Sequence, residues 1–287
     1  MKITSLVLLL QGIALAADIP LWPDHPPEFL ANAPAEITEA RGSIRNVTVP
    51  SLNVMPAPPE KRNGMAIIIC AGGGYGALDW KTHVLYAAEV FNPMGVTVIG
   101  LKYRLRPPHK LDNAGIQRLA LMDAQRAVRT VRHRAAEWGI DPHKLGVAGY
   151  SAGANLTMNL AAKFDLGDAK SADAIERESS RPDFAVGLAT WHWRQKESPF
   201  VFRKDTPPVF LVHAINDGID GGAPIEMPRA IKADLEKLGV PVRMIEFNEG
   251  GHGVGNLIPQ RVQHGFPPAK WPVLLTDWLK TLPAMKP

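Results

Sequence analysis

The sequence predicts an α/β fold, in which a mostly parallel sheet is covered by helices on both faces. From residue 65 onward, short apolar runs alternate with longer amphipathic stretches, and this alternation is typical of parallel strands joined by helices. The runs are apolar at nearly every position, as expected for strands buried on both faces. The 287 residues are 46% hydrophobic and 21% charged, so the chain can build one large core.

The expected strands and helices follow one another along the chain. Strands are expected at the runs MAIIIC, GVTVIGL, LGVAGY, FAVGLAT, VFLVHA and VRMIEF. Helices are expected over residues 81–92, 114–138, from 151 onward, 227–238 and 270–282. Gly139 and Gly239 are typical helix ends, and Pro228 suits a first helical turn. In such a sheet, functional side chains lie on loops after the carboxyl ends of the strands.

The region before these strands has a different composition. Residues 1–16 combine a positive Lys2 with a short apolar run and an Ala-Leu-Ala ending, which predicts a cleaved signal peptide and export to the periplasm or the medium. A buried N-terminal helix is the alternative. Residues 18–60 are rich in proline and predict an extended arm with one strand near residues 44–49. We therefore expect one domain over residues 17–287, with no membrane association after cleavage.

Charge and cysteine content argue against two classes of function. The formal net charge is +4, but the basic residues are scattered. Their densest stretch, residues 126–134, is interpreted as a solvent-exposed helix face, so no nucleic-acid partner is expected. Cys70 is the only cysteine and ends an apolar run. It is interpreted as a small buried hydrophobe, with a catalytic thiol as the alternative.

A G-x-S-x-G motif spans residues 149–153, between an expected strand and an expected helix. In this context the motif forms a sharp turn that exposes a serine nucleophile. Gly149 and Gly153 remove side chains that would clash across the turn. The alternative is an ordinary turn serine. We predict that Ser151 is the nucleophile.

A serine nucleophile needs a base and a third group that orients the base. In this arrangement the acid and then the histidine follow the serine along the chain. Asp217 comes after the VFLVHA run and is the predicted acid, with Asp220 as its rival. His252, flanked by glycines after VRMIEF, is the predicted base because imidazole titrates near neutral pH. His213 is interpreted as a buried histidine of the core or behind the site.

The glycine-rich stretch after the MAIIIC run predicts an oxyanion hole. The backbone N–H of Ala152 and that of Gly73 or Gly74 are the expected donors, and the sequence does not choose between the two glycines. The stretch lacks the spacing of a phosphate-binding loop. No metal-binding motif occurs among the nine histidines, so neither a metal nor another cofactor is expected.

Aromatic side chains near these loops are the candidate substrate contacts. Flat rings stack on sugar rings or other flat apolar groups. A loop packed by its own aromatics is the alternative for the stretch TWHWR at residues 190–194. The candidates are Tyr75, Trp80, Trp191, His192 and Trp193.

With these residues in place, the chain resembles α/β-hydrolase-fold serine esterases, and more narrowly the carbohydrate esterases that include acetyl xylan and feruloyl esterases. The resemblance is carried by IPLWP, CAGGGYGAL, GLKYRL, PPVFLVHAINDG, GGHGVG and, most specifically, RAAEWGIDPHKLGVAGYSAG. Three departures surround the expected pocket. Ala71 replaces a proline, residues 82–83 lack an acidic residue, and residues 190–192 lack a Tyr-Pro pair. The resemblance thus implies ester hydrolysis more firmly than it implies xylan.

The expected function is that of a secreted carboxylesterase that removes short acyl groups, acetyl or feruloyl, from plant polysaccharide. A broad carboxylesterase or lipase acting on other esters is the first alternative, although residues 164–183 are too charged for a lipase lid. A peptidase or amidase is the second, and a non-catalytic binding module is the third. The sequence leaves the oligomeric state open.

Overall fold

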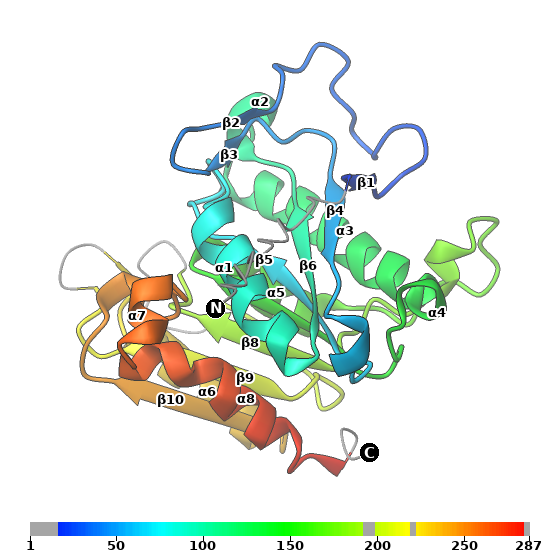
Figure 1. The fold of residues 1–287 in the computed structure, drawn as a ribbon. Helices are drawn as coiled ribbons and strands as arrows, with labels where there is room; N and C mark the ends of the chain where they lie inside the picture. Colours follow the sequence, from blue (N-terminus) through cyan, green and yellow to red (C-terminus); the bar gives the residue numbers. More distant parts are fainter. Residues whose placement is uncertain (1–16, 192–198, 219–221, 284–287) are drawn as a thin grey trace, which may run out of the picture.

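An eight-stranded sheet forms the centre of the molecule (Figure 1). The computed structural model describes residues 17–191, 199–218 and 222–283. Six strands are joined by parallel pairing, while β4 and β1 pair in the antiparallel direction at one edge. The strands lie in the order β1 (Ile19–Pro20), β4 (Ser51–Met55), β6 (Thr97–Lys102), β5 (Ala66–Cys70), β7 (Leu145–Tyr150), β8 (Phe184–Leu188), β9 (Val209–Ala214) and β10 (Val242–Phe247). All six expected strands are present, and the α/β class is confirmed.

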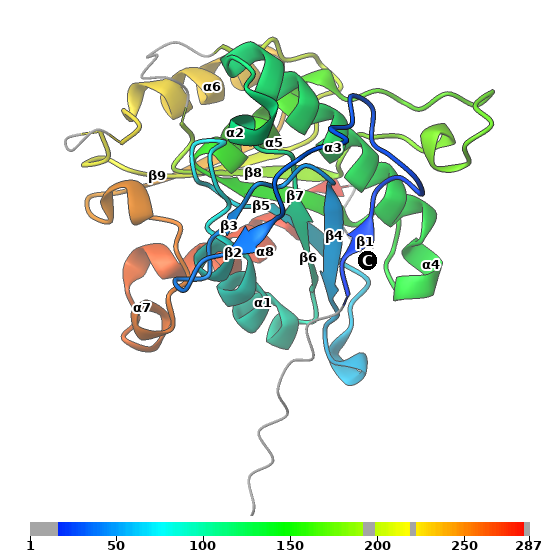
Figure 2. The same ribbon diagram turned by 90° about the horizontal axis from the view of Figure 1, so that it is seen from above.

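Helices cover both faces of the sheet (Figure 2). Helices α3, α5 and α6 lie on one face, and α1 and α8 lie on the other. The short helices α2 and α7, which the sequence did not predict, lie in loops. The helices are α1 (Tyr86–Phe91), α2 (Arg106–His109), α3 (Asn113–His133), α4 (Ala135–Trp138), α5 (Ala152–Lys163), α6 (Glu226–Lys237), α7 (Pro259–Gln263) and α8 (Trp271–Leu279). Within the described residues, no helix has the length and hydropathy of a membrane span.

The arm is built differently from the expectation. The strand expected near residues 44–49 stops early, because Asn46 has a left-handed backbone with φ of 59°. Only β3 (Ile44–Arg45) forms there, and it pairs with β2 (Ile37–Thr38) outside the main sheet. The arm contributes β1 and β4 to the main sheet, and β4 begins after Pro50.

Two expected helices contain an irregularity. The helix expected over residues 81–92 opens with a π-helical turn, Lys81–Leu85, before α1 begins. The long helix expected over residues 114–138 is divided into α3 and α4 at Arg134, and Gly139 ends it in the left-handed conformation as predicted.

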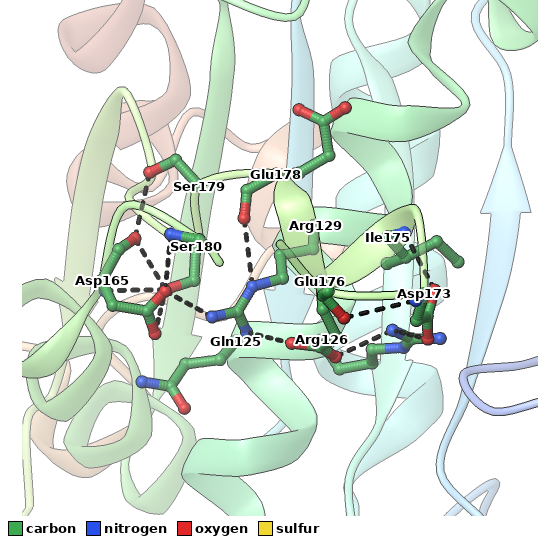
Figure 3. Close-up of polar contacts among 12 residues, drawn as sticks. Gln125, Arg126, Arg129, Asp165, Asp173, Ile175, Glu176, Glu178, Ser179 and Ser180 are labelled. Carbon is green, nitrogen blue, oxygen red and sulfur yellow. Dashed lines mark hydrogen bonds and ion pairs between the residues drawn. The ribbon is translucent and has the colours of Figure 1, made fainter. Parts of the chain in front are cut away.

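The prediction that residues 126–134 form a solvent-exposed helix face is wrong. Arg126 and Arg129 are only 2% and 7% exposed, because residues 164–183 lie over them and supply carboxylates (Figure 3). Arg126 Nη1 lies 2.6 Å from Asp173 and 2.8 Å from Glu176, and Arg129 Nη2 lies 2.5 Å from Asp165. Helical periodicity located the helix, but it did not reveal that a distant segment covers this face.

The core between sheet and helices is apolar. Cys70 is fully buried in it at the end of β5, and burial raises the pKa of its thiol to about 12. A thiol that stays protonated is a poor nucleophile. Cys70 therefore packs as a small hydrophobe, as the sequence indicated.

Candidate active site

Ser151 stands on a sharp turn between β7 and α5. Its backbone has φ of 52° and ψ of −116°, a conformation that side-chain-bearing residues rarely adopt. A Cβ atom on Gly149 would lie 2.0 Å from the carbonyl oxygen of Gly153, and one on Gly153 would lie 2.0 Å from that of Cys70. Both flanking glycines are therefore required for the turn to pack between β5 and α5, as the motif predicted.

The predicted triad residues lie within hydrogen-bond distance of one another. Parallel β7, β9 and β10 end at the same edge of the sheet, so the loops after them meet there. His252 Nε2 lies 2.7 Å from Ser151 Oγ, and His252 Nδ1 lies 2.9 Å from Asp217 Oδ2. The carboxylate of Asp217 can only accept a hydrogen bond, so Nδ1 carries the ring proton. Nε2 then accepts the hydrogen bond that the Ser151 hydroxyl donates. The histidine side chain is 39% exposed, whereas the aspartate side chain is 1% exposed.

The loop after β9 holds Asp217 in place. The backbone N–H of Ala223 donates to Asp217 Oδ1 over 3.0 Å. Behind it, His213 is fully buried, and its Nε2 lies 2.9 Å from the Ala223 carbonyl oxygen and 3.4 Å from Asp217 Oδ2. Burial lowers the pKa of His213, which agrees with its interpretation as a buried histidine behind the site. The rival Asp220 lies outside the described residues.

The predicted oxyanion donors lie on the loop after β5 and at the start of α5. Gly73 and Gly74 have φ of 134° and 61°, which turns their peptide groups as only glycine readily allows. In the described part of the chain, neither glycine N–H donates to a protein acceptor. Ala152 is the first residue of α5, so its N–H has no partner within the helix. The geometry does not choose between Gly73 and Gly74.

Two of the predicted substrate contacts, Tyr75 and Trp80, are buried instead. Tyr75 is 1% exposed; its hydroxyl donates to Asn155 Oδ1 over 2.8 Å and its ring packs on Tyr103. Trp80 is 6% exposed, and its ring lies so close to β6 that a Cβ atom on Gly100 would fall 2.4 Å from it. Both rings are buried in the fold, so neither offers a free face to a sugar.

Of the remaining aromatic candidates, Trp191 lies beside Ser151 in the fold. The backbone N–H of Trp191 donates to the carbonyl oxygen of Ser151 over 3.4 Å, and its side chain is partly buried. A role in substrate binding stays a prediction for Trp191. His192 and Trp193 lie outside the described residues.

Sequence reasoning missed the side chains that hold the loops of the site. The hydroxyl of Tyr103 donates to the carbonyl oxygen of Ala71 over 2.6 Å, and Asn216 Oδ1 accepts from the N–H of Gly251 over 3.0 Å. His83 accepts from the glycine-rich loop as well. Of these three side chains, only His83 lies at a position that the resemblance to carbohydrate esterases had singled out. No group of three or more potential metal ligands forms within the described residues.

Residues 67–176 match the α/β hydrolase fold family. An acetylxylan esterase of Xylanibacter ruminicola is 36% identical over 34% of this chain and 19% of that protein. The carboxylesterase NlhH of Mycobacterium tuberculosis is 32% identical over 46% of this chain and 41% of that protein. The chain thus spans less than half the length of these two relatives.

Solved structures agree over nearly the whole chain. An acetyl ester-xyloside bifunctional hydrolase from Caldicellulosiruptor lactoaceticus superposes with a TM-score of 0.72 at 27% identity, covering 92% of this chain and 96% of that one. A thermophilic esterase from Thermogutta terrifontis gives a TM-score of 0.63 at 21% identity over 83% and 90% of the two chains, which bears on the fold alone. The chain is therefore an α/β-hydrolase-fold protein that is similar to carbohydrate esterases.

Proposed function

We propose that the chain is a serine ester hydrolase that works through an acyl-enzyme. The observation that carries the proposal is the hydrogen-bonded series from Ser151 Oγ to His252 Nε2, and from His252 Nδ1 to Asp217. A serine hydroxyl near neutral pH becomes an effective nucleophile only when such a base removes its proton.

Each residue has a role in the proposed reaction. Ser151 attacks the ester carbonyl carbon while His252 accepts the hydroxyl proton, and Asp217 stabilises the imidazolium that forms. The N–H groups of Ala152 and of Gly73 or Gly74 stabilise the negative oxygen. His252 then donates its proton to the leaving alcohol, and a water molecule activated by the same ring releases the acid from Ser151.

The proposed substrates are short-acyl esters, acetyl or feruloyl, on plant polysaccharide. The similarity to an acetylxylan esterase and to an acetyl ester-xyloside hydrolase supports the choice of acetyl esters. The choice of plant polysaccharide is supported by the 27% identity over 68% of this chain to endo-1,4-beta-xylanase B of Butyrivibrio fibrisolvens, of which the match covers 33%. A broad carboxylesterase is the alternative that the similarity to NlhH favours.

A lipase is disfavoured by the state of residues 164–183. A lipase lid needs an apolar face that opens over lipid, whereas Asp165, Asp173 and Glu176 bind this segment to arginines of α3.

The composition of residues 1–16 supports export as part of the proposal. N-terminal sequencing of the protein from the periplasm and the medium would test it, with a start near Ala17 expected.

The substrate class is tested by parallel assays. Acetate release from acetylated xylan, ferulate release from feruloylated xylan and cleavage of p-nitrophenyl esters of increasing chain length are compared, with a p-nitroanilide as the amide control. We expect fast turnover of short-chain esters and of one xylan ester, and little with long acyl chains or amides. Equal rates on all aryl esters with none on either xylan would favour the broad carboxylesterase.

The chemistry is tested with a fluorophosphonate probe, which modifies an activated serine. We expect labelling of the intact protein and none of Ser151→Ala. An unlabelled, inactive intact protein would instead indicate a non-catalytic binding module.

Trp191→Ala should raise KM on xylan, with Trp138→Ala on α4 as the control.

A further inference from the structure

His83 connects the two loops that face each other across Ser151. It lies in the π-helical turn Lys81–Leu85 and is buried. The N–H of Gly72, in the glycine-rich loop, donates to His83 Nδ1 over 3.1 Å. On the other side of the ring, Nε2 lies 3.1 Å from Asn256 Oδ1, in the loop that carries His252. One ring thus bridges Gly72, which is 11 residues from His83, and Asn256, which is 173 residues from it.

The two contacts fix the protonation of the ring. A backbone N–H can only donate, so His83 Nδ1 must present a lone pair to Gly72. The proton then lies on Nε2 and is donated to Asn256 Oδ1. Burial lowers the pKa of His83 to about 4, although Asp79, whose Oδ2 lies 3.9 Å from Nε2, and the hydrogen bond to Asn256 act in the opposite direction. His252 lowers this pKa slightly further. The ring is therefore neutral where the triad is expected to work.

Packing leaves this ring little freedom. It stacks on Tyr150, the residue before the nucleophile, with centroids 4.2 Å apart and planes 12° from parallel. A Cβ atom on Gly72 would lie 3.1 Å from Ser151 Cβ and 3.2 Å from His83 Cε1. The glycine-rich loop, the nucleophile turn and the ring are therefore in close contact. A π-helical turn is an unusual feature that is frequent at functional sites.

We propose that His83 is a positioning residue that sets the distance between the oxyanion loop, residues 71–76, and the loop that carries His252. The inference rests on the proposed function. By accepting from Gly72, the ring occupies that N–H and orients the next peptide groups, those of Gly73 and Gly74, towards the carbonyl of a bound ester. By donating to Asn256, it holds the base loop in the same frame. Small displacements of such donors lower the rate strongly because the transition-state oxygen needs them at fixed positions.

Three substitutions separate the two contacts. His83→Asn keeps an oxygen near the position of Nδ1 and so keeps an acceptor for Gly72. His83→Gln places its amide near Nε2 and keeps the contact with Asn256, while Gly72 loses its acceptor. His83→Phe removes both hydrogen bonds but can still stack on Tyr150. His109→Phe, in α2 and outside the triad, controls for the general effect of replacing a partly buried histidine.

The first readout is steady-state kinetics on p-nitrophenyl acetate, well below each variant's unfolding temperature. We expect kcat to fall about 10- to 100-fold in His83→Phe and His83→Gln and less than about fivefold in His83→Asn, with KM changed little. Affinity for a trifluoromethyl ketone, which mimics the tetrahedral intermediate, should fall in step with kcat/KM. Wild-type kcat in His83→Phe, or equal losses in all three variants that follow their loss of thermal stability, would overturn the inference.

The second readout does not depend on activity. Hydrogen exchange of a peptide that covers residues 71–78 should accelerate about tenfold in His83→Phe and His83→Gln but stay near wild type in His83→Asn and His109→Phe. If the wild type hydrolyses no ester, the proposed function fails, and the exchange pattern alone decides whether His83 holds the loop. If Ser151→Ala abolishes activity but the exchange is unchanged in His83→Phe, the proposed function stands and the inference about His83 is wrong.

Discussion

Helix α3 and residues 164–183 are joined by charged groups, whereas the loops of the candidate active site are joined largely by neutral ones. Arg126 and Arg129 reach carboxylates that remain partly exposed to water. At the site, His83, Tyr103 and Asn216 bind the loops through backbone groups and one amide. Both networks attach a loop to the rest of the fold, but with different chemistry.

The difference follows from what each region has to tolerate. A carboxylate at the surface keeps part of its hydration, so pairing it with a buried arginine costs little desolvation. At the candidate active site, His83 and Tyr103 are buried, and a charged group in their place would lose its hydration. Most of the contacts that hold these loops come from neutral groups, and Arg261, whose Nη1 donates to the carbonyl oxygen of Gly253 over 2.8 Å, is a charged exception. The same comparison orders the predictions below by the size of their expected effects.

The largest effect is expected for Ser151→Ala. Loss of the proposed nucleophile should lower kcat/KM on p-nitrophenyl acetate by at least about 10⁴-fold, while the thermal midpoint moves little because one partly exposed hydroxyl is lost. Stopped assays and calorimetry check the two quantities. Activity within tenfold of wild type would contradict the assignment of Ser151 as the nucleophile. The loops around it could then no longer be compared as parts of an active site.

The next largest effect is expected for another ion pair of α3. Asp123 and Arg104 form a fully buried pair, so Asp123→Ala leaves an uncompensated buried cation and should reduce the free energy of unfolding by about 3–5 kcal/mol. Asp173→Ala is the matched control; its carboxylate is well exposed, and the loss should stay below about 1 kcal/mol. Urea titrations of both variants measure the difference. Similar losses of unfolding free energy in the two variants would show that burial does not determine how much each ion pair stabilises the fold.

Acidification should separate the two regions by pH window. His83 has a folded pKa of about 4 against 6.5 when unfolded, so the unfolded chain binds the proton first. Its contribution, roughly 3 kcal/mol at about 1.4 kcal/mol per unit, is present above pH 6.5 and is lost as the pH falls through 4. His83→Phe should flatten the fall of unfolding free energy between pH 6.5 and 4 relative to wild type.

Asp165, in residues 164–183, should respond at lower pH than His83. Burial raises the pKa of Asp165, but the hydrogen bond from Arg129 and neighbouring donors outweigh it, and the net shift is downward from 3.8. A lowered carboxylate pKa stabilises the fold above its ordinary value and ceases to do so as the pH falls below it. Asp165→Asn should therefore lower the free energy of unfolding by a constant amount above about pH 4 and change the slope of the curve only below that pH. A change confined to the window of His83 would contradict this separation.

The smallest effect is expected from salt. At 1 M NaCl the screening length is about 3 Å, which weakens the partly exposed ion pairs of residues 164–183. Hydrogen exchange of that segment should rise about two- to fivefold, while residues 71–78, held by neutral hydrogen bonds, should not change. Equal acceleration in both segments would indicate that salt acts on global stability instead.

The parts of the molecule that the sequence predicted well depend on local patterns. The strand–turn–helix setting of Ser151 is contained in a few consecutive residues, and Asp217 and His252 each follow an apolar run. Parallel strands end at one edge, so these local patterns were sufficient to bring the three side chains together. The choice between Gly73 and Gly74 stays open because it depends on a bound substrate.

The failed predictions concern side chains whose surroundings come from elsewhere in the chain. Trp80 was expected at the pocket, but Gly100 of β6 leaves space for its ring in the core. Tyr75 is buried, and its hydroxyl donates to Asn155 Oδ1 of α5. Arg126 was expected in solvent, but the carboxylates of residues 164–183 cover it.

The amino-acid sequence by itself determined the order of strands and helices, the position of the nucleophile turn and the identity of the triad candidates, because periodicity and glycine placement act within one element. Tertiary structure decided which aromatic and charged side chains are buried, and it placed His83 between Gly72 and Asn256. Burial and hydrogen-bond partners arise from contacts between residues far apart in the chain, and a single sequence does not encode those distances in any local pattern.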